Sequence, residues 1–472
     1  MRVALLSCGS PAGLEYQPPL GLAYLVAYLR ANGVPDVHFL DYQHLRDRAM
    51  RTELQRLAPD MVGINCVTPL RMRSLALARL AKEVRPQAPV VFGGIHATFL
   101  AAQLLQTYPE IDYVVCGEGE QTLLELVRCI ESHGDPAAIQ GIAFRRDGQI
   151  IETPRRAWIE NLDSLPFPAY FDHYSLEDGG GRKAGEMITS RGCGGACNYC
   201  SVTHFWGRPR LRSPRSVVDE MEHLIKDHGV GYIRVMDDTF TVDMDRAAAV
   251  CEEILRRNLR VQWRCTTRAD CFSPELARLL SRAGCLRLSI GAESGSDAIL
   301  KTIHKNVTVQ QTEDTCRWAR EAGMFLEVCF MVGNIGESRE TIEETKALAR
   351  RIRPDEFCVS SAVYLFPGTP LFRYAARRGL IDDSVWLKND PVFPYTAEHT
   401  PEELLGWQME IIRECAASKG LYQYLRYALR VAARMPPKAI VRAGWSFLKA
   451  NLPGARSHKA APATPQEPTT HE

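Results

Sequence analysis

Cys193, Cys197 and Cys200 form a C-x3-C-x2-C run, and this run constrains the fold more than any other feature of the chain. Three thiolates at this spacing can each hold one iron of a cubane, because soft sulfur ligands suit iron–sulfur centres. The fourth iron would then have no protein ligand. The run therefore predicts a [4Fe–4S] cluster with one open iron, at which a small molecule can bind and receive an electron.

An alternative interpretation places the three cysteines on one buried face of a helix, since positions i, i+4 and i+7 lie on the same side. Gly192, Gly194 and Gly195 disfavour that helix, because each glycine inside a helix costs about 1 kcal/mol. Glycines suit a loop that curls around a cluster and directs backbone amides at its sulfurs. We therefore predict a cluster-binding loop.

The remaining cysteines of the 15 are scattered through apolar segments, at positions 8, 66, 116, 129, 251, 265, 271, 285, 316, 329, 358 and 415. They are predicted to be small core residues that stay reduced in a cytoplasm. A net charge of +1 gives no sign of a nucleic-acid partner. The apolar run at the amino terminus is too short for a signal peptide, and no run is long enough for a membrane-spanning helix.

Residues 1–145 alternate short apolar runs with amphipathic stretches, which predicts a parallel sheet covered by helices. The predicted strands are 2–7, 38–41, 61–65, 90–93 and 113–116, and the predicted helices are 20–32, 46–57, 74–84, 97–107 and 121–133. This order fits a doubly wound, Rossmann-like domain. Glycines and small polar residues follow several strands, where open sheets bind ligands, although glycines there could simply make tight turns.

Residues 146–183 are predicted to be a linker, because prolines and a Gly-Gly-Gly run interrupt any periodicity. Strands and helices alternate again over residues 184–385. The predicted strands are 186–189, 232–236, 262–266, 286–290, 326–332 and 357–365, and the predicted helices include 217–228, 246–257 and 274–283. About six βα units predict a partial barrel of the TIM type, with its functional residues at the carboxyl ends of the strands.

Residues 386–453 are predicted to be helical, and the later part of this segment is strongly basic. No acidic residue lies between Glu414 and Glu467, and aromatic and aliphatic side chains interleave with the lysines and arginines. A cationic amphipathic helix of this kind can lie on an anionic membrane surface. A solvated helix packed on the barrel has the same periodicity, so both interpretations stay open. The tail 454–472 is predicted to be disordered.

Several further segments follow the cysteine run in a fixed order, namely residues 235–240, 288–296, 330–337 and 364–371, and Tyr199 directly precedes the third cysteine. With these segments the chain resembles the radical SAM superfamily. The resemblance implies that the open iron binds the amino and carboxylate groups of S-adenosylmethionine (SAM). An electron from the cluster would then cleave the sulfonium and give a 5′-deoxyadenosyl radical.

The resemblance also implies which residues contact SAM. Asp237 and Asp238 correspond to contacts of the methionyl amino group, and Glu293 and Ser294 to contacts of the ribose or methionyl part. Tyr199, Gly333 and Gly336 would lie near the adenine, although Ile335 stands where the family commonly has proline. Helix capping and surface ion pairs are the alternative roles for the carboxylates.

Residues 1–145 resemble the cobalamin-binding domain that precedes the barrel in one subclass of the superfamily. The supporting segments are residues 18–25, 93–98 and 117–120. The cobalamin contacts inferred for this domain are Cys66, Thr68, Gly93, Gly94, His96, Gly117 and Glu118. The Asp-x-His-x-x-Gly motif of other cobalamin domains is replaced by Gly9-Ser-Pro-Ala-Gly, so no protein histidine is expected on the lower face of cobalt.

Two reactions fit this resemblance. The first is methyl transfer to an unactivated carbon of a small-molecule natural product or lipid. The second is radical ring formation, as in the anaerobic cyclase of bacteriochlorophyll synthesis. A reducing partner such as flavodoxin or ferredoxin is implied, and no nucleic acid. The enzyme is expected in the cytoplasm, with the basic segment as a possible contact with the inner membrane face.

Two other functions are disfavoured. A transfer-RNA methylthiotransferase would need a second cysteine set, for which Cys8, Cys66 and Cys116 could be mistaken, and it would end in an RNA-binding β-barrel rather than in helices. A cluster-bearing scaffold without turnover would not need the intact segment 288–296.

Overall fold

The computed structural model describes residues 1–9, 18–170, 176–177, 183–388, 394–395 and 397–417. Their first part is an α/β domain around one sheet, with the order β2-β1-β3-β4-β5-β6-β7. Its strands are β1 (Val3–Ser7), β2 (Val37–Asp41), β3 (Met61–Asn65), β4 (Val90–Gly93), β5 (Tyr113–Val115), β6 (Ile142–Arg146) and β7 (Gln149–Glu152). The first five pair in parallel, so the predicted doubly wound domain is confirmed.

The predicted domain boundary at residue 145 is wrong, because it falls inside β6. β6 pairs antiparallel with β5, and the hairpin to β7 carries the sheet on to Glu152. The prediction missed this hairpin because its outward side chains are polar and the segment has no crossover helix to mark it.

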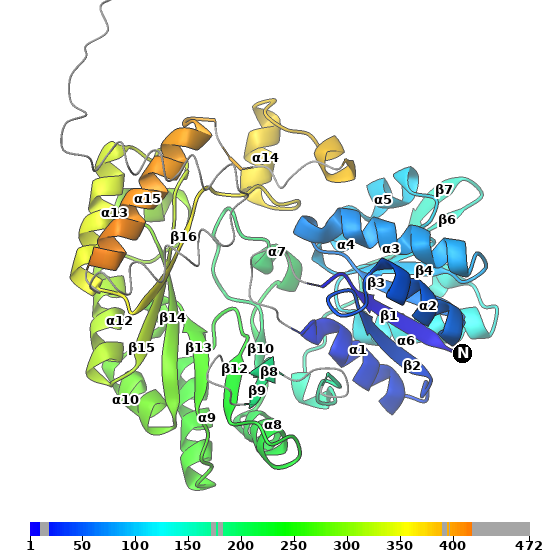
Figure 1. Cartoon of the computed structure of the whole chain (residues 1–472), viewed down its shortest axis with the longest axis horizontal. Coiled ribbons are helices and arrows are strands. Elements are labelled where there is room, and N and C mark those ends of the chain that lie inside the picture. Colours follow the sequence, from blue (N-terminus) through cyan, green and yellow to red (C-terminus); the bar gives the residue numbers. More distant parts are fainter. Residues whose placement is uncertain (10–17, 171–175, 178–182, 389–393, 396, 418–472) are drawn as a thin grey trace, which may run out of the picture. The chain divides into compact units, whose positions relative to one another are not determined.

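Helices cover both faces of this sheet, which explains why its parallel strands are almost continuously apolar. The helices are α1 (Leu20–Ala31), α2 (Asp47–Leu57), α3 (Arg71–Val84), α4 (Ile95–Phe99), α5 (Ala101–Thr107) and α6 (Gly119–Glu131). α1 and α6 pack side by side on one face, where they enclose Leu5 and Val91 (Figure 1). α2, α3 and α5 cover the other face, over Leu6 and Ile64. The predicted helix 97–107 is divided at Leu100.

The second sheet has the order β16-β15-β14-β13-β12-β9-β8. Its strands are β8 (Leu176–Glu177), β9 (Lys183–Met187), β12 (Tyr232–Val235), β13 (Trp263–Thr267), β14 (Cys285–Glu293), β15 (Phe325–Met331) and β16 (Glu356–Ser360). From β9 to β16 all neighbours are parallel, which confirms the predicted partial barrel. β8 pairs antiparallel with β9 and lies in the predicted linker, so that segment contributes an edge strand.

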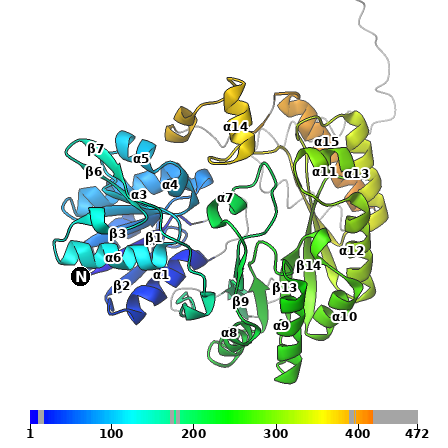
Figure 2. The ribbon, with the colours of Figure 1, turned by 180° about the vertical axis from the view of Figure 1, so that it is seen from behind.

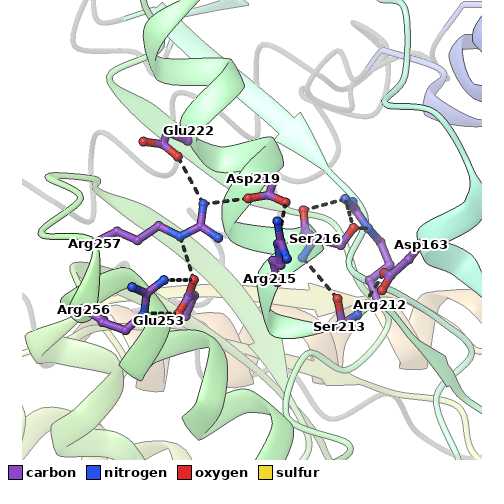
Figure 3. Close-up of polar contacts among 10 residues, drawn as sticks. All are labelled: Asp163, Arg212, Ser213, Arg215, Ser216, Asp219, Glu222, Glu253, Arg256 and Arg257. Atoms are coloured by element: carbon purple, nitrogen blue, oxygen red, sulfur yellow. Dashed lines mark hydrogen bonds and ion pairs between the residues drawn. The ribbon is translucent and has the colours of Figure 1, made fainter.

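Successive helices pack against one another around the outside of this barrel (Figure 2). They are α8 (Pro214–Lys226), α9 (Met244–Arg256), α10 (Pro274–Arg282), α12 (Val309–Glu321) and α13 (Arg339–Ile352), with the short α11 (Asp297–Thr302) before α12. Ion pairs link α8 to the end of α9: Arg257 Nη1 lies 2.7 Å from Asp219 and 3.1 Å from Glu222, and its Nε bonds Glu253 (Figure 3). These charges stabilise the helical layer on the outside of the barrel.

The predicted helical region after residue 385 is confirmed in part. α14 (Pro370–Arg377) precedes it, and α15 (Pro401–Ala417) packs on α13 and β16. The basic segment from Lys419 and the tail 454–472 lie outside the described residues. Within the described residues no helix combines the length and the apolar character needed to cross a bilayer.

Candidate active site

The three cysteines lie on a loop that a short antiparallel ribbon closes at its base. β10 (Ser190–Arg191) pairs with β11 (Arg210–Leu211), and the loop between them carries the cysteines and the short helix α7 (Val202–Trp206). Residues 192–198 have no helical structure, which confirms the predicted loop. Gly192 and Gly194 adopt φ values of +94° and +71°, in the left-handed region that glycine tolerates best.

The loop fits a cubane cluster. Cys197 is buried, Cys193 and Cys200 are half-buried, and all three are free thiols. A side chain at Gly195 would meet Arg268 Nη1 at 2.7 Å and Cys193 Sγ at 3.5 Å, so only glycine leaves this space open. Among the described residues no three ligands converge on a point for a single metal ion. A cubane does not need that convergence, because each thiolate binds a different iron.

Positive charges surround Cys197. Arg268 Nη1 lies 4.0 Å from its Sγ, and Arg268 Nη2 donates to the carbonyl of Lys305 at 2.7 Å. Burial raises the pKa of the Cys197 thiol, and the charges of Lys305 and Arg268 oppose that rise. Burial also raises the pKa of Cys200, to about 11. Thiols in such a site need a bound cation to become thiolates, which is what an iron–sulfur cluster supplies.

Glu293 ends β14 in a strained conformation. Its φ is +64°, and the pairing of β14 with β15 shifts register between Gly291 and Glu293. Non-glycine residues in this region are unusual and often occur at binding sites. Lys305 Nζ lies 3.0 Å from Glu293 Oε1, which fixes the carboxylate beside the cluster loop. The neighbouring Ser294 is fully buried and bonds Thr345 and the amide of Ser296, so its hydroxyl stabilises the turn.

The two predicted aspartates lie in different environments. Asp237 is buried, and its carboxylate accepts hydrogen bonds from the amides of Thr189 and Ser190 at 2.6 and 3.1 Å. It therefore holds the segment that leads into β10. Asp238 follows β12 at the barrel mouth and is exposed to solvent, but nearby protein atoms still displace part of its hydration water. This desolvation and the charge of Asp237 raise the pKa of Asp238 to about 6.

The predicted adenine loop after β15 is held by carboxylates. The Glu337 carboxylate accepts hydrogen bonds from the amides of Gly333 and Asn334. The Glu398 carboxylate accepts one from the amide of Gly336 at 2.7 Å. Both glycines have positive φ values, of 88° and 74°. The loop is thus preformed, as a backbone-based recognition site requires. Tyr199 is half-buried and packs against an apolar cluster that extends from the first sheet to the residues around α11 and α14.

A cavity of about 360 Å³ opens in the first domain. Apolar side chains from the strands and from α1 and α6 line it, among them Leu5, Leu22, Leu25, Val91 and Leu123. Gly63 of β3 makes the space possible, since a Cβ there would lie 2.6 Å from Leu5 Cδ2. A largely apolar cavity whose lining also holds the charged residues Glu118, Glu120 and Arg191 fits a large organic cofactor such as the cobalamin that the resemblance of residues 1–145 implies.

The predicted cobalamin contacts fall into two groups. Gly93, Gly94, Gly117 and Glu118 line the cavity. Cys66, Thr68 and His96 are buried outside its lining. His96 Nδ1 lies 3.0 Å from Thr68 Oγ1, and burial lowers the pKa of His96 to about 3. Thr68 instead faces a smaller cavity of about 90 Å³ together with Ser201. Residues 10–13 of the Gly9-Ser-Pro-Ala-Gly segment, which replaces the histidine motif, lie outside the described residues.

The cysteines that a second cluster would need do not form an open site. Cys8 and Cys66 are fully buried, and the Cys8 thiol lies 3.0 Å from Ser74 Oγ and 3.1 Å from the carbonyl of Asn65. Burial raises the pKa of Cys8 to about 12. These thiols belong to the apolar core, as predicted.

Two family models match the chain in the regions of these two sites. Residues 187–349 match the Radical SAM superfamily, and residues 14–127 match the B12 binding domain. The chain belongs to the cobalamin-binding radical SAM family. The predicted cofactors, a [4Fe–4S] cluster, SAM and cobalamin, are those of this family.

Curated relatives support this membership. The chain is 33% identical over 423 residues to the anaerobic magnesium-protoporphyrin IX monomethyl ester cyclase of Cereibacter sphaeroides, covering 86% of this chain and 68% of the relative. It is 32% identical to the uncharacterized methyltransferase PH0819 of Pyrococcus horikoshii, covering 80% and 82%. A Rubrivivax gelatinosus protein with the same cyclase name is 35% identical over 72% of this chain, but the chain spans only 63% of that protein.

Solved structures share the fold. The radical S-adenosylmethionine methyltransferase TsrM of Kitasatospora setae, with cobalamin and a [4Fe–4S] cluster bound, superposes with a TM-score of 0.69 at 22% identity, covering 86% of this chain and 84% of TsrM. The cobalamin-dependent enzyme OxsB, with aqua-cobalamin bound, gives 0.71 at 17% identity, covering 95% and 71%.

Several residues of the site were not predicted from the sequence. Arg268 follows the end of β13, so the strand-end rule that selected Asp237 could have found it. Thr239, whose Oγ1 lies 3.2 Å from Cys193 Sγ, follows β12 in the same way. No local sequence pattern marks Lys305 or Arg191. Lys305 pairs with Glu293, 12 residues earlier, and Arg191 pairs with Glu118 and Glu120 of the first domain.

Proposed function

We propose that this protein cleaves SAM reductively at a cluster bound by Cys193, Cys197 and Cys200, and transfers a methyl group to an unactivated carbon of a small molecule. One observation carries the proposal. Helix α7 directly follows Cys200, and its residues Phe205 and Trp206 form part of the wall of the cavity in the first domain. The cluster loop and the cobalamin cavity therefore adjoin, as a reaction that uses both cofactors requires.

The residues of the chain have distinct roles in this proposal. Asp238, at the barrel mouth, accepts a charge-assisted hydrogen bond from the methionyl ammonium group. Glu293, fixed by Lys305, accepts hydrogen bonds from the ribose hydroxyls. Arg268 and Lys305 place positive charge beside Cys197, which favours the addition of an electron there. When bound, the cluster would supply that electron and cobalamin would carry the methyl group.

Replacing the three cysteines tests the cluster site. The Cys193→Ala, Cys197→Ala and Cys200→Ala proteins, reconstituted anaerobically, should lack iron–sulfur absorbance and form no 5′-deoxyadenosine. Cys129→Ala is a matched control, because Cys129 is half-buried at the end of α6 and lies outside the site. Cleavage of SAM by the triple variant would refute the assignment.

Ring formation is the second candidate reaction, since the cyclases are among the relatives of highest identity. Two relatives named as methyltransferases favour methyl transfer. The match to this chain covers 82% of the length of one and 79% of the length of the other. Incubation of lipid and pigment extracts with the enzyme and methyl-labelled SAM separates the two. Label in a product supports methyl transfer, whereas an unlabelled product that gains a ring supports the cyclase reaction.

We also propose that the enzyme works in the cytoplasm with a flavodoxin or ferredoxin as reductant, and that its basic segment contacts an anionic membrane surface. The charge pattern after Glu414 supports the membrane contact. Removing residues 420–472 should leave SAM cleavage intact and reduce co-sedimentation with vesicles that contain phosphatidylglycerol. Unchanged sedimentation would exclude the contact.

A further inference from the structure

Two arginines face each other at the base of the cluster loop. Arg191 of β10 and Arg210 of β11 are register partners, and they are only 6% and 3% exposed. Like charges at opposed positions of a ribbon repel, and a buried charge is costly unless it is paired. The ribbon that closes the loop therefore needs counter-charges from elsewhere in the fold.

The counter-charges come from the cobalamin-binding domain. Glu118 and Glu120 lie at the start of α6, and Arg191 bonds both, with Nη2 at 2.5 Å from Glu120 Oε1. Arg210 Nη1 lies 2.9 and 2.8 Å from the two oxygens of Glu118. These four residues form a neutral, buried unit, which we call the clamp. Both oxygens of Glu118 are occupied by protein donors, one of them also by the amide of Ile159.

Aromatic rings hold the clamp in place. The guanidinium of Arg191 lies over Tyr24 of α1 and Trp206 of α7, at 5.6 and 5.4 Å from the ring centres. Arg210 lies over Trp206 as well, at 5.9 Å. Cation–π contacts of this kind strengthen when water is excluded. The clamp thus connects the helices beside the cavity with the helix that follows Cys200.

Three clamp residues, Arg191, Glu118 and Glu120, also line the cavity of the first domain, together with Trp206. A molecule that fills the cavity must contact the groups that fix the base of the cluster loop. We propose that the clamp couples cobalamin binding to the geometry of the cluster loop, with Glu118 as the positioning residue. This inference rests on the proposed function, because it needs a cluster on the loop and cobalamin in the cavity.

Coupling of this kind is reciprocal, so SAM bound at the loop must change the affinity for cobalamin by the same factor by which cobalamin changes the affinity for SAM. The measurement is the dissociation constant of hydroxocobalamin, followed by absorbance, for anaerobically reconstituted protein with and without SAM. We expect a coupling factor of at least about fivefold in the natural protein. In Glu118→Gln it should fall to about one, since the carboxylate no longer pairs both arginines.

Glu125→Gln is the matched control. Glu125 lies on the same helix and pairs with Arg156 rather than with the cluster loop, so its variant should keep the natural coupling factor. The electron paramagnetic resonance spectrum of the reduced cluster gives a second readout: added cobalamin should perturb it in the natural protein and not in Glu118→Gln.

If Glu118→Gln does not fold, as judged by circular dichroism, Glu120→Gln decides. This variant removes one of the two carboxylates that hold Arg191 at the cavity and should lower the coupling factor, while Glu118 still neutralises both arginines so that the protein can fold. A reduced factor in that variant supports the clamp, and an unchanged factor overturns it. A natural protein that binds cluster, SAM and cobalamin with a coupling factor of one also overturns the clamp alone. A natural protein that binds no cluster overturns the proposed function instead.

Discussion

Lys305 Nζ lies 3.0 Å from Glu293 Oε1, and this pair stands between the carboxyl end of β14 and the cluster loop. Both side chains are largely buried, at 7% and 15% exposure. Glu293 carries the left-handed backbone conformation that marks the end of its strand, so the lysine fixes an acid whose main chain is already strained. The same lysine contributes positive charge at Cys197. One side chain thus orients the carboxylate that we propose to face SAM, and adds positive charge beside Cys197.

Replacing Lys305 by Met should destabilise the protein by about 3–5 kcal/mol, because it leaves the Glu293 carboxylate buried without its partner. Urea unfolding measures this loss. The double variant Lys305→Met/Glu293→Gln should recover most of the stability and still cleave SAM poorly. Full recovery of cleavage in the double variant would show that the pair has only a structural role.

Asp238→Asn should weaken SAM binding roughly tenfold or more at pH 8, since a hydrogen bond to a charged group is lost. The pKa of Asp238 is raised from 3.8 to about 6, so the ionised form costs stability in the folded state. That cost grows as the pH rises from 3.8 to about 6 and is constant above. The variant should therefore melt at a higher temperature than the natural protein at pH 8, with the difference vanishing near pH 4. Asp245→Asn, an exposed residue of α9, is the control for both measurements.

Gly63→Ala should lower cobalamin affinity by roughly tenfold or more, because the added methyl group forces the Leu5 side chain into the cavity. Absorbance titration with hydroxocobalamin measures the effect, and the iron content should stay unchanged. Gly406→Ala adds the same methyl group within α15, where it meets nothing within 4 Å, and should leave the affinity unaltered. Equal affinities in the two variants would place the cofactor outside this cavity.

Arg257→Ala should lower the free energy of unfolding by about 1 kcal/mol at low salt, since it removes the partly exposed ion pairs with Asp219 and Glu222 of α8 and with Glu253 of α9 (Figure 3). The loss should shrink in 1 M NaCl, where such pairs are screened. Urea titrations at both salt concentrations measure it. Arg256→Ala removes only the pair with Glu253 and should have a smaller effect. A fall in SAM cleavage by Arg257→Ala would contradict the structural role of this network.

The sequence by itself determined most of the strand and helix order of both domains, and the cluster loop. Buried parallel strands such as Val3–Ser7 are continuous apolar runs, and helices such as α8 begin at Ser213-Pro214, so neighbouring residues carry the signal. The spacing of Cys193, Cys197 and Cys200 is equally local. The hairpin β6–β7 was missed because its exposed side chains are polar and no crossover helix marks it, and the edge strand β8 was missed because it has only 2 residues.

Only the tertiary structure decided which predicted residues are free to bind ligands. Glu118 lines the cavity, but its oxygens are already paired with Arg191, 73 residues later in the chain, and with Arg210. The Asp237 carboxylate accepts hydrogen bonds from the amides of Thr189 and Ser190 at the start of β10, 48 and 47 residues earlier, which leaves Asp238 at the barrel mouth. The cavity exists because Gly63 faces Leu5 on a neighbouring strand. A hydrogen bond or a void between distant segments depends on how the sheets and helices pack, and no local pattern of residues contains that information.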